Sequence, residues 1–143
     1  MSEDIPDLDR FDLGAAWRTG TRLVQICQRE HHAVAIDIFL GEQRAFHAAL
    51  PGSSADNDSW LERKARVVRR FGCSSHEVSV RLVGDDAAVF FTTFALSPAE
   101  FAPWGGAVPI VVRGSMVGVL AVSGLASAED HDLAVAALRA ELT

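Results

Sequence analysis

Hydrophobic and polar residues follow two different periods along the chain, and each period predicts a different kind of element. From residue 13 to about residue 30, apolar side chains recur every three or four positions behind Asp12. This pattern predicts a helix that Asp12 caps. Residues 33–40 and 44–50 are rich in β-forming side chains and flank a Gly-Glu-Gln turn, which predicts a β-hairpin.

Two later stretches of the chain also favour strands. Residues 108–113 and 116–123 flank Gly114-Ser115. A pair that begins with glycine suits a type II′ turn, so these residues predict a second hairpin. Residues 87–95 contain valine, phenylalanine and threonine in close succession, which predicts another strand, although its place in a sheet stays open.

At four predicted helix starts a serine is followed three residues later by an acid, a pattern typical of the capping box; these serines are Ser59, Ser74, Ser97 and Ser127. We therefore predict four further helices, near residues 60–71, 75–83, 98–102 and 128–141. The predicted order of elements is α-β-β-α-α-β-α-β-β-α. Hairpins at both ends with helices between them favour an α+β architecture, with an antiparallel sheet covered on one face.

The composition fits one globular domain with a core of its own. The chain has 143 residues, of which 49% are hydrophobic and 22% are charged. We predict a flexible acidic tail over residues 1–10 and a single domain over residues 11–143. A net charge of −6 argues against a general binder of nucleic acid or of anionic membranes. No apolar run approaches the roughly 20 residues of a membrane span.

Cysteine and histidine usage gives no framework for disulfides or metals. Cys27 and Cys73 are too few and too far apart for a disulfide framework or a zinc site, and the histidines show no ligand spacing. We therefore expect a reduced, cytoplasmic protein with no metal site. Ser123 lacks the flanking glycines of a nucleophile elbow, so hydrolysis is not supported.

The most suggestive chemistry lies at the start of the helix predicted near residue 60. Asn57, Trp60 and Lys64 are three and four residues apart and share one side of that helix. Lys64 is the only lysine, beside twelve arginines, and its ammonium is a compact point charge. An amide, an indole and an ammonium near free helix amides suit an anionic, partly flat ligand. The alternative is a core tryptophan, a turn asparagine and a solvated lysine.

Two other features nearby admit structural explanations. Gly105 and Gly106 precede a strand, whereas a phosphate-binding loop follows one, so we interpret them as allowing positive φ or close approach of another group. The helix that carries Lys64 also has a basic face. We expect this face to be solvated or to pair with an acidic face of another subunit; its residues are Arg63, Arg66, Arg69 and Arg70.

Three segments together resemble a known family. They are DNDSWLERK at residues 56–64 with Ser74-Ser75 following, GGAVPI at residues 105–110, and GVLAVSGL at residues 118–125 with EDH at residues 129–131. This combination resembles the branch of the GlcG/HbpS-like superfamily whose small uncharacterised members are labelled "heme-degrading domain". The resemblance covers the chain from its first predicted helix to its end.

The resemblance implies a five-stranded, profilin-like antiparallel sheet and homo-oligomers built from dimers. It also implies a ligand pocket, and relatives in the wider superfamily bind haem, degrade it slowly or accompany corrinoid enzymes. Two departures lower the expectation of haem chemistry: Trp104 stands where the branch commonly has histidine, and no Glu-x-x-Glu pair occurs. The pocket residues that carry over are Asn57, Trp60, Arg63, Lys64, Gly105, Gly106, Ser123 and Gly124.

Three functions remain open from the sequence. The first is a homo-oligomeric module that binds a small anionic or tetrapyrrole-like ligand at these residues. The second is a non-catalytic assembly or adaptor protein that makes contacts through the Arg63, Arg66 and Arg70 face and through its acidic tail. The third is a haem-degrading enzyme with haem as cofactor, whose axial ligand would come from His47, His76 or His131. No catalytic residue can be assigned, and we favour the ligand-binding module.

Overall fold

The two predicted hairpins form the centre of one sheet, because a strand of each pairs with a strand of the other. In this computed structural model, which describes residues 5–142, β2 (Ala35–Leu40) pairs antiparallel with both β3 (Gln43–Ala49) and β5 (Ser115–Ser123). The latter pairs in turn with β4 (Ala107–Val112), and the strand order is β1-β4-β5-β2-β3. The predicted α+β class and five-strand count are confirmed.

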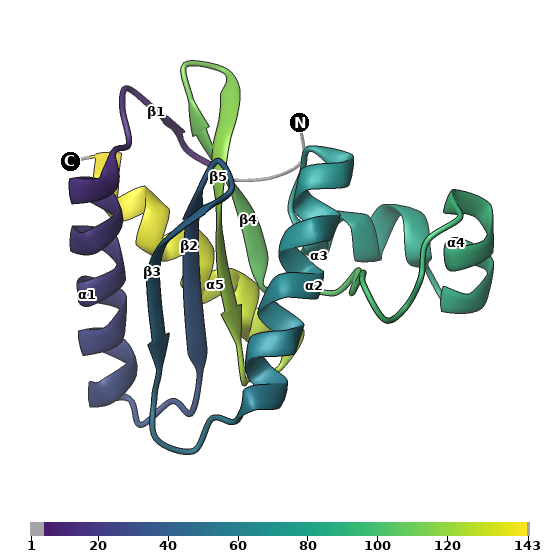
Figure 1. Ribbon diagram of the computed structural model, residues 1–143, viewed down its shortest axis with the longest axis horizontal. Helices are drawn as coiled ribbons and strands as arrows, with labels where there is room; N and C mark the ends of the chain where they lie inside the picture. Colours follow the sequence, from purple (N-terminus) through teal and green to yellow (C-terminus); the bar gives the residue numbers. More distant parts are fainter. Residues whose placement is uncertain (1–4, 143) are drawn as a thin grey trace.

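Helices cover both faces of the sheet (Figure 1). The first core cluster joins one face to α1 (Leu13–Arg29) and α5 (Ser127–Arg139), and it includes Ile36 and Ile38. The second joins the other face to α2 (Ala55–Phe71) and includes Ala35 and Phe39. The prediction that only one face is covered is wrong. Strand β2 is almost continuously apolar, as expected of a strand that is buried on both sides.

The fifth strand comes from the segment that the sequence assigned to a flexible tail. Asp7 and Leu8 form β1, which pairs parallel with β4 and makes the sheet mixed. Leu8 is 3% exposed and belongs to the first core cluster, and Ile5 packs against it. The rest of the predicted tail, residues 1–4, lies outside the described residues.

The segment predicted as a strand at residues 87–95 is instead helix α4 (Ala87–Phe94). The Asp86 carboxylate accepts a hydrogen bond from the Val89 N–H and caps it, and a helix places Phe90 and Phe94 one turn apart. Both rings pack against Phe71 of α2, at centroid distances of 5.9 and 5.2 Å. Tertiary packing therefore overrides the β-propensity of this stretch.

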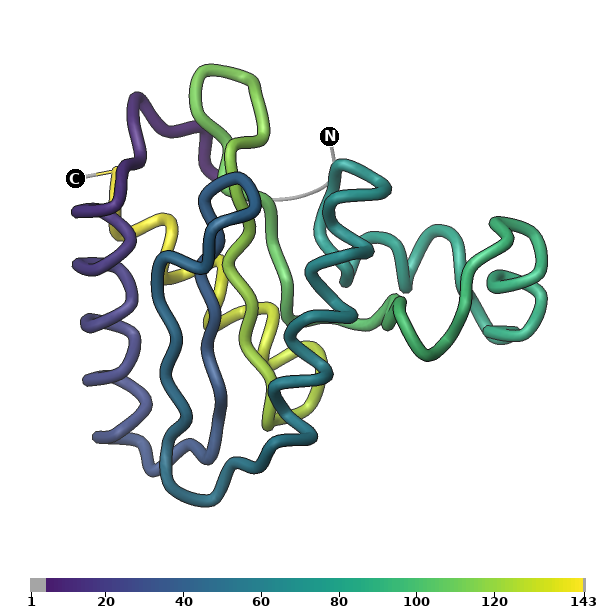
Figure 2. The backbone as a smooth tube through the Cα atoms, viewed as in Figure 1, coloured from purple at the N-terminus to yellow at the C-terminus, as the bar shows by residue number. Residues whose placement is uncertain are grey.

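Helix α4 lies at the end of an arm that extends away from the sheet (Figure 2). The arm begins with α3 (Ser75–Val78), continues as the π-helix η1 (Ser79–Val83) and has its own core cluster with α2. The helix predicted at residues 98–102 is a turn. The Ser97 side chain accepts a hydrogen bond there from the Ala99 N–H, and no helix follows.

The other helix boundaries differ in detail from the predictions. Asp12 caps α1 and Ser74 caps α3, as expected. Helix α2 begins earlier than predicted, because Ser54 and Asn57 form its capping box rather than Ser59. The second hairpin turns at Arg113-Gly114, where both φ angles are positive (50° and 83°), as in a type I′ rather than a type II′ turn. No helix within residues 5–142 has the length and apolar character required to cross a membrane.

Arginines of α1 bind the last turn of the chain, the 3-10 helix η2 (Ala140–Leu142). Arg18 and Arg22 each place a guanidinium nitrogen on the Glu141 carboxylate, at 2.7 and 2.6 Å. Burial alone would raise the pKa of Glu141, but the hydrogen bonds and charges of the two arginines outweigh burial and lower it below its ordinary 4.5. This ion pair therefore stabilises the fold above that pH.

We expect Glu141→Gln to lower the free energy of unfolding at neutral pH by less than about 1 kcal/mol, because Arg18 is largely exposed to solvent. A carboxyl whose pKa is lower in the folded state stabilises the fold above the unfolded pKa. That stability is lost as pH falls through the folded value. The difference in free energy of unfolding between wild type and variant should thus shrink below pH 4.5, as measured by urea unfolding at a series of pH values. A difference that stays constant on acidification would contradict this assignment.

Candidate functional site

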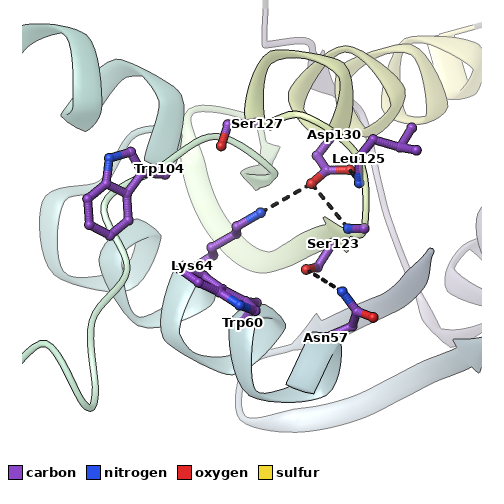
Figure 3. Close-up of a pocket in the computed structure, with 9 residues that line it drawn as sticks. Asn57, Trp60, Lys64, Trp104, Ser123, Leu125, Ser127 and Asp130 are labelled. Carbon is purple, nitrogen blue, oxygen red and sulfur yellow. Dashed lines mark hydrogen bonds and ion pairs between the residues drawn. The ribbon is translucent and has the colours of Figure 1, made fainter. Parts of the chain in front are cut away.

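A cavity of about 410 Å³ lies where the first half of α2 faces the end of β5 and the start of α5. Its volume is within the range of small-molecule sites. Three of its lining residues come from α2, three from β5 and the loop after it, two from α5 and one from the loop before β4 (Figure 3). The lining residues are Asn57, Trp60, Lys64, Trp104, Ser123, Gly124, Leu125, Ser127 and Asp130.

A buried ion pair forms the floor of this cavity. The Lys64 side chain is 5% exposed, and its Nζ lies 3.3 Å from Oδ2 of Asp130, which is 2% exposed. Nζ also donates to the Val122 carbonyl at 3.4 Å, and Asp130 accepts from the N–H groups of Gly124 and Leu125. Lys64 is therefore not the solvated charge of the alternative interpretation, and Asp130 fixes the loop between β5 and α5.

Gly106 makes the room that this pair occupies. A Cβ atom on Gly106 would lie 2.4 Å from the Val122 oxygen, 2.7 Å from Lys64 Nζ and 3.2 Å from Asp130 Cβ. Its φ of +140° is also one that other residues rarely adopt. The structure thus supports the interpretation of this glycine as a point of close approach, and the approaching groups are the Val122 carbonyl, Lys64 and Asp130.

Burial shifts the pKa of both members of the pair toward the neutral form. Burial lowers the pKa of Lys64, against the charge and hydrogen bond of Asp130, and neighbouring Arg63 lowers it further. Burial raises the pKa of Asp130, against the charge of Lys64 and the hydrogen bonds from Leu125, Lys64 and Gly124. A buried ammonium with two long hydrogen bonds is weakly solvated, which is the physical reason for its shift.

Two indoles form walls of the cavity. Trp60 and Trp104 meet edge to face, with ring centroids 6.2 Å apart. The Trp60 Nε1–H donates to the Asp56 carboxylate, and the Arg63 guanidinium lies 4.1 Å from the Trp60 ring centroid. These contacts hold Trp60 in place, and they put the positive charge of Arg63 against its ring.

The cavity is also lined by polar side chains at the end of β5 and at the starts of α2 and α5. The Asn57 side-chain amide donates to the Ser123 hydroxyl at 3.4 Å, which joins α2 to the end of β5. Helix α5 begins there after Ala126, which has no polar side-chain atom, so α5 lacks a side-chain cap. Uncapped N–H groups at a helix start favour a negatively charged group nearby.

The structure brings five of the eight predicted site residues together around one cavity: Asn57, Trp60, Lys64, Ser123 and Gly124. Gly106 lies directly beneath Lys64. Gly105 instead packs against the Ser127 carbonyl, and Arg63 supports Trp60 from outside the lining.

Four lining residues are absent from the sequence-based set: Trp104, Leu125, Ser127 and Asp130. Asp130 is the most important of them. In the sequence it is one of several acids in the first turn of a helix, where the helix dipole already explains an acid. Only the fold shows that Asp130 is buried, whereas its neighbour Glu129 is exposed.

The histidines named as possible haem ligands lie outside this lining. The Nδ1 atom of His47 is 2.7 Å from buried Asp37, and its Nε2 is 3.8 Å from Asp58. His76 and His131 stack on one another with centroids 4.7 Å apart. Within residues 5–142, no group of three or more histidine, cysteine or acidic side chains is arranged to hold a metal ion.

Residues 11–139 match the family described as haem degrading protein HbpS-like. The chain belongs to this HbpS-like family, as its resemblance implied. A relative from Streptomyces avermitilis, named only "UPF0303 protein", is 45% identical over 137 residues, which are 95% of this chain and 83% of the relative.

Solved structures agree on the fold. The Ybr137w protein superposes with a TM-score of 0.85 at 31% identity, over 97% of this chain and 88% of that one. A structure titled as a complex of PduOC with haem gives a TM-score of 0.73 at 21% identity, over 87% of this chain and 90% of that one. At that lower identity, the likeness shows a shared fold.

Proposed function

We propose that this chain is a small-molecule-binding module whose Lys64 cavity takes a flat organic anion. The observation that carries the proposal is the combination of two indole walls with a buried lysine in a cavity of about 410 Å³. Indoles bind flat rings through large apolar contacts, and fixed polar groups orient the ligand against them.

The preference for an anion rests on the charges that line or border the cavity. Ser127, in the uncapped first turn of α5, and Lys64 line the same cavity, and the Arg63 guanidinium lies on Trp60. Asp130 is the acid in the lining, and its carboxylate is already held by Lys64 and two backbone N–H groups. A ligand carboxylate would therefore meet positive charge that the protein only partly neutralises.

A tetrapyrrole is the second candidate, and the description of the family favours it. The residues present do not fit a ligated haem iron, because the described lining contains no histidine, cysteine, methionine or tyrosine. Trp104 fills the position where the branch commonly has histidine. A tetrapyrrole would be held here by contacts to its rings and propionates, and we derive no reaction from the iron.

Calorimetric titration with 2-naphthoate tests the proposal. We expect saturable binding that Trp60→Leu weakens about tenfold or more, since an aromatic wall is lost. The matched control is Trp17→Leu: Trp17 lies on α1, is 65% exposed and does not line the cavity. Equal loss of affinity in both variants, or no binding by wild type, would contradict the proposal. Hemin followed at its Soret band tests the second candidate on the same proteins.

The proposal includes assembly into homo-oligomers in the cytoplasm. The arm formed by α3, η1 and α4 supports self-association, because Val80, Leu82 and Val89 expose between 42% and 65% of their surface there. Contact surfaces between subunits commonly include exposed apolar side chains. Sedimentation of the purified protein at low and high salt distinguishes an apolar interface from the charge-mediated contacts of an adaptor with a basic helix face.

A further inference from the structure

We infer that Lys64 is a nucleophilic amine, which forms a reversible imine with an aldehyde or ketone that enters the cavity. This inference rests on the proposed function, since it places a covalent step in the same cavity. It goes beyond that function because it names the reactive group and the chemical class of the ligand, an aromatic or carboxylate-bearing carbonyl compound.

The first support is the position of the amine. Lys64 lines the cavity although its side chain is only 5% exposed, so a molecule bound there lies against a side chain that bulk water reaches poorly. Its two protein contacts are long, at 3.3 and 3.4 Å, whereas an ammonium has three donors. The charged form is thus poorly stabilised for a buried group, and burial lowers its pKa.

The second support is a base in contact with the amine (Figure 3). Asp130 Oδ2 lies 3.3 Å from Nζ, and Gly124 and Leu125 N–H groups fix the orientation of that carboxylate. Burial raises the pKa of Asp130, so this carboxylate is a better proton acceptor than an exposed one. Desolvated lysines beside an acid-base group are the usual amine nucleophiles of proteins.

The step balances without any oxidant or cofactor. Asp130 takes one proton from the Lys64 ammonium, and the nitrogen lone pair forms a bond to the carbonyl carbon while the carbonyl π electrons move to oxygen. Proton transfers give a neutral carbinolamine. Asp130 then returns its proton to the hydroxyl group, and the nitrogen lone pair forms the C=N bond as that group leaves as water. One carbonyl compound and one ammonium thus yield one protonated imine and one water, and the Asp130 carboxylate balances the charge of the imine.

The surrounding residues select the carbonyl compound. Trp60 and Trp104 provide apolar contact for an aromatic ring, and the Ser123 hydroxyl and Asn57 amide lie within the same lining. Asp130 itself would repel a carboxylate placed directly beside it. A carboxylate on the far side of the ring would instead lie toward the uncapped start of α5.

Reductive trapping with p-formylbenzoate and cyanoborohydride tests this inference. Lys64 is the only lysine, so the one other primary amine in the chain is the α-amino group, which serves as an internal reference in peptide mapping by mass spectrometry. We expect one aldehyde to add to Lys64, and this adduct should form faster than the adduct on the α-amino group. Benzaldehyde, which lacks the carboxylate, should trap more slowly.

Two variants separate chemistry from folding. Lys64→Arg keeps the positive charge and should give no adduct at residue 64. Asp130→Asn keeps the lysine, and it should slow trapping on the order of a hundredfold through loss of the base. The control Trp17→Leu should trap as wild type does. Circular dichroism shows which variants are folded.

Each outcome decides between the claims. Trapping only at the α-amino group, or trapping of Lys64 at the rate seen in urea-unfolded protein, would overturn the inference. Calorimetric binding of p-formylbenzoate without an adduct on Lys64 would overturn the imine alone and leave the proposed binding site intact. If neither this aldehyde nor 2-naphthoate binds and no adduct forms, both claims are wrong.

Discussion

Replacing Lys64 by methionine is expected to lower the free energy of unfolding by about 3–5 kcal/mol, because it leaves Asp130 buried without its counter-charge. Asp130 is 1% exposed, so water cannot replace the ammonium. The two backbone N–H groups that remain on its carboxylate put the expected value toward the lower end. Urea unfolding followed by circular dichroism measures the change.

The loss should also depend on pH. Burial already raises the pKa of Asp130 in the wild type, and removal of Lys64 raises it further. A carboxyl whose pKa is higher in the folded state stabilises the fold below the unfolded pKa, and that stability is lost as pH rises through the folded value. The difference between wild type and Lys64→Met should therefore be smaller near the ordinary pKa of 3.8 than at neutral pH.

Two controls identify the cause. Arg70→Met removes an exposed cation from the same helix and should change stability by less than about 0.5 kcal/mol. The double variant Lys64→Met, Asp130→Asn removes both charges and should recover much of the loss. If it is no more stable than Lys64→Met alone, the cost comes from lost packing rather than from an unpaired charge.

Gly106→Ala is expected to destabilise the fold by about 3 kcal/mol or more, since strain at a positive φ adds to overpacking. The new methyl group would lie 2.4 Å from the backbone oxygen of Val122, which cannot move without disturbing the hydrogen bond from the Val122 N–H to the Gly106 carbonyl. It would also displace Lys64 Nζ. Affinity for 2-naphthoate should fall with stability.

Gly41→Ala is the matched control for this substitution. Gly41 also has a positive φ, of +57°, but a Cβ atom there would meet nothing within 4 Å. The free energy of unfolding of Gly41→Ala should fall only by the conformational cost of about 1–2 kcal/mol, and this variant should bind ligand normally. Equal losses at the two positions would mean that the space beneath Lys64 is not what Gly106 provides.

The elements with a strong local signal could be predicted from the sequence. Asp12, Ser74 and the two hairpins are set by cap and turn chemistry. Both caps and the first hairpin form where predicted, and the second hairpin turns one residue earlier, at Arg113-Gly114. Residues 87–95 could not be predicted, because the contacts of Phe90 and Phe94 with Phe71 decide their conformation. Strand β1 could not be predicted either. It has only two residues, and they pair with β4, which lies far away in the sequence, so they leave no local pattern.

The residues of the candidate site likewise include some that the sequence predicts and others that only the fold brings into the cavity. Asn57, Trp60 and Lys64 were found because helical spacing is local and because a single lysine among arginines is a visible anomaly. Asp130 cannot be predicted, because its burial depends on how α5 packs against β5, and no spacing connects it with Lys64 in the sequence. Trp104 approaches Trp60 only through the loop before β4.

The three tryptophans allow the most direct test of the central claim, that a flat organic anion binds in the Lys64 cavity. Each indole N–H gives its own signal in a proton–nitrogen correlation spectrum, and single substitutions assign the three signals. On titration with 2-naphthoate, we expect the Trp60 and Trp104 signals to shift together and saturate while the Trp17 signal stays fixed. Saturating shifts confined to Trp17, or no shift at all, would contradict it.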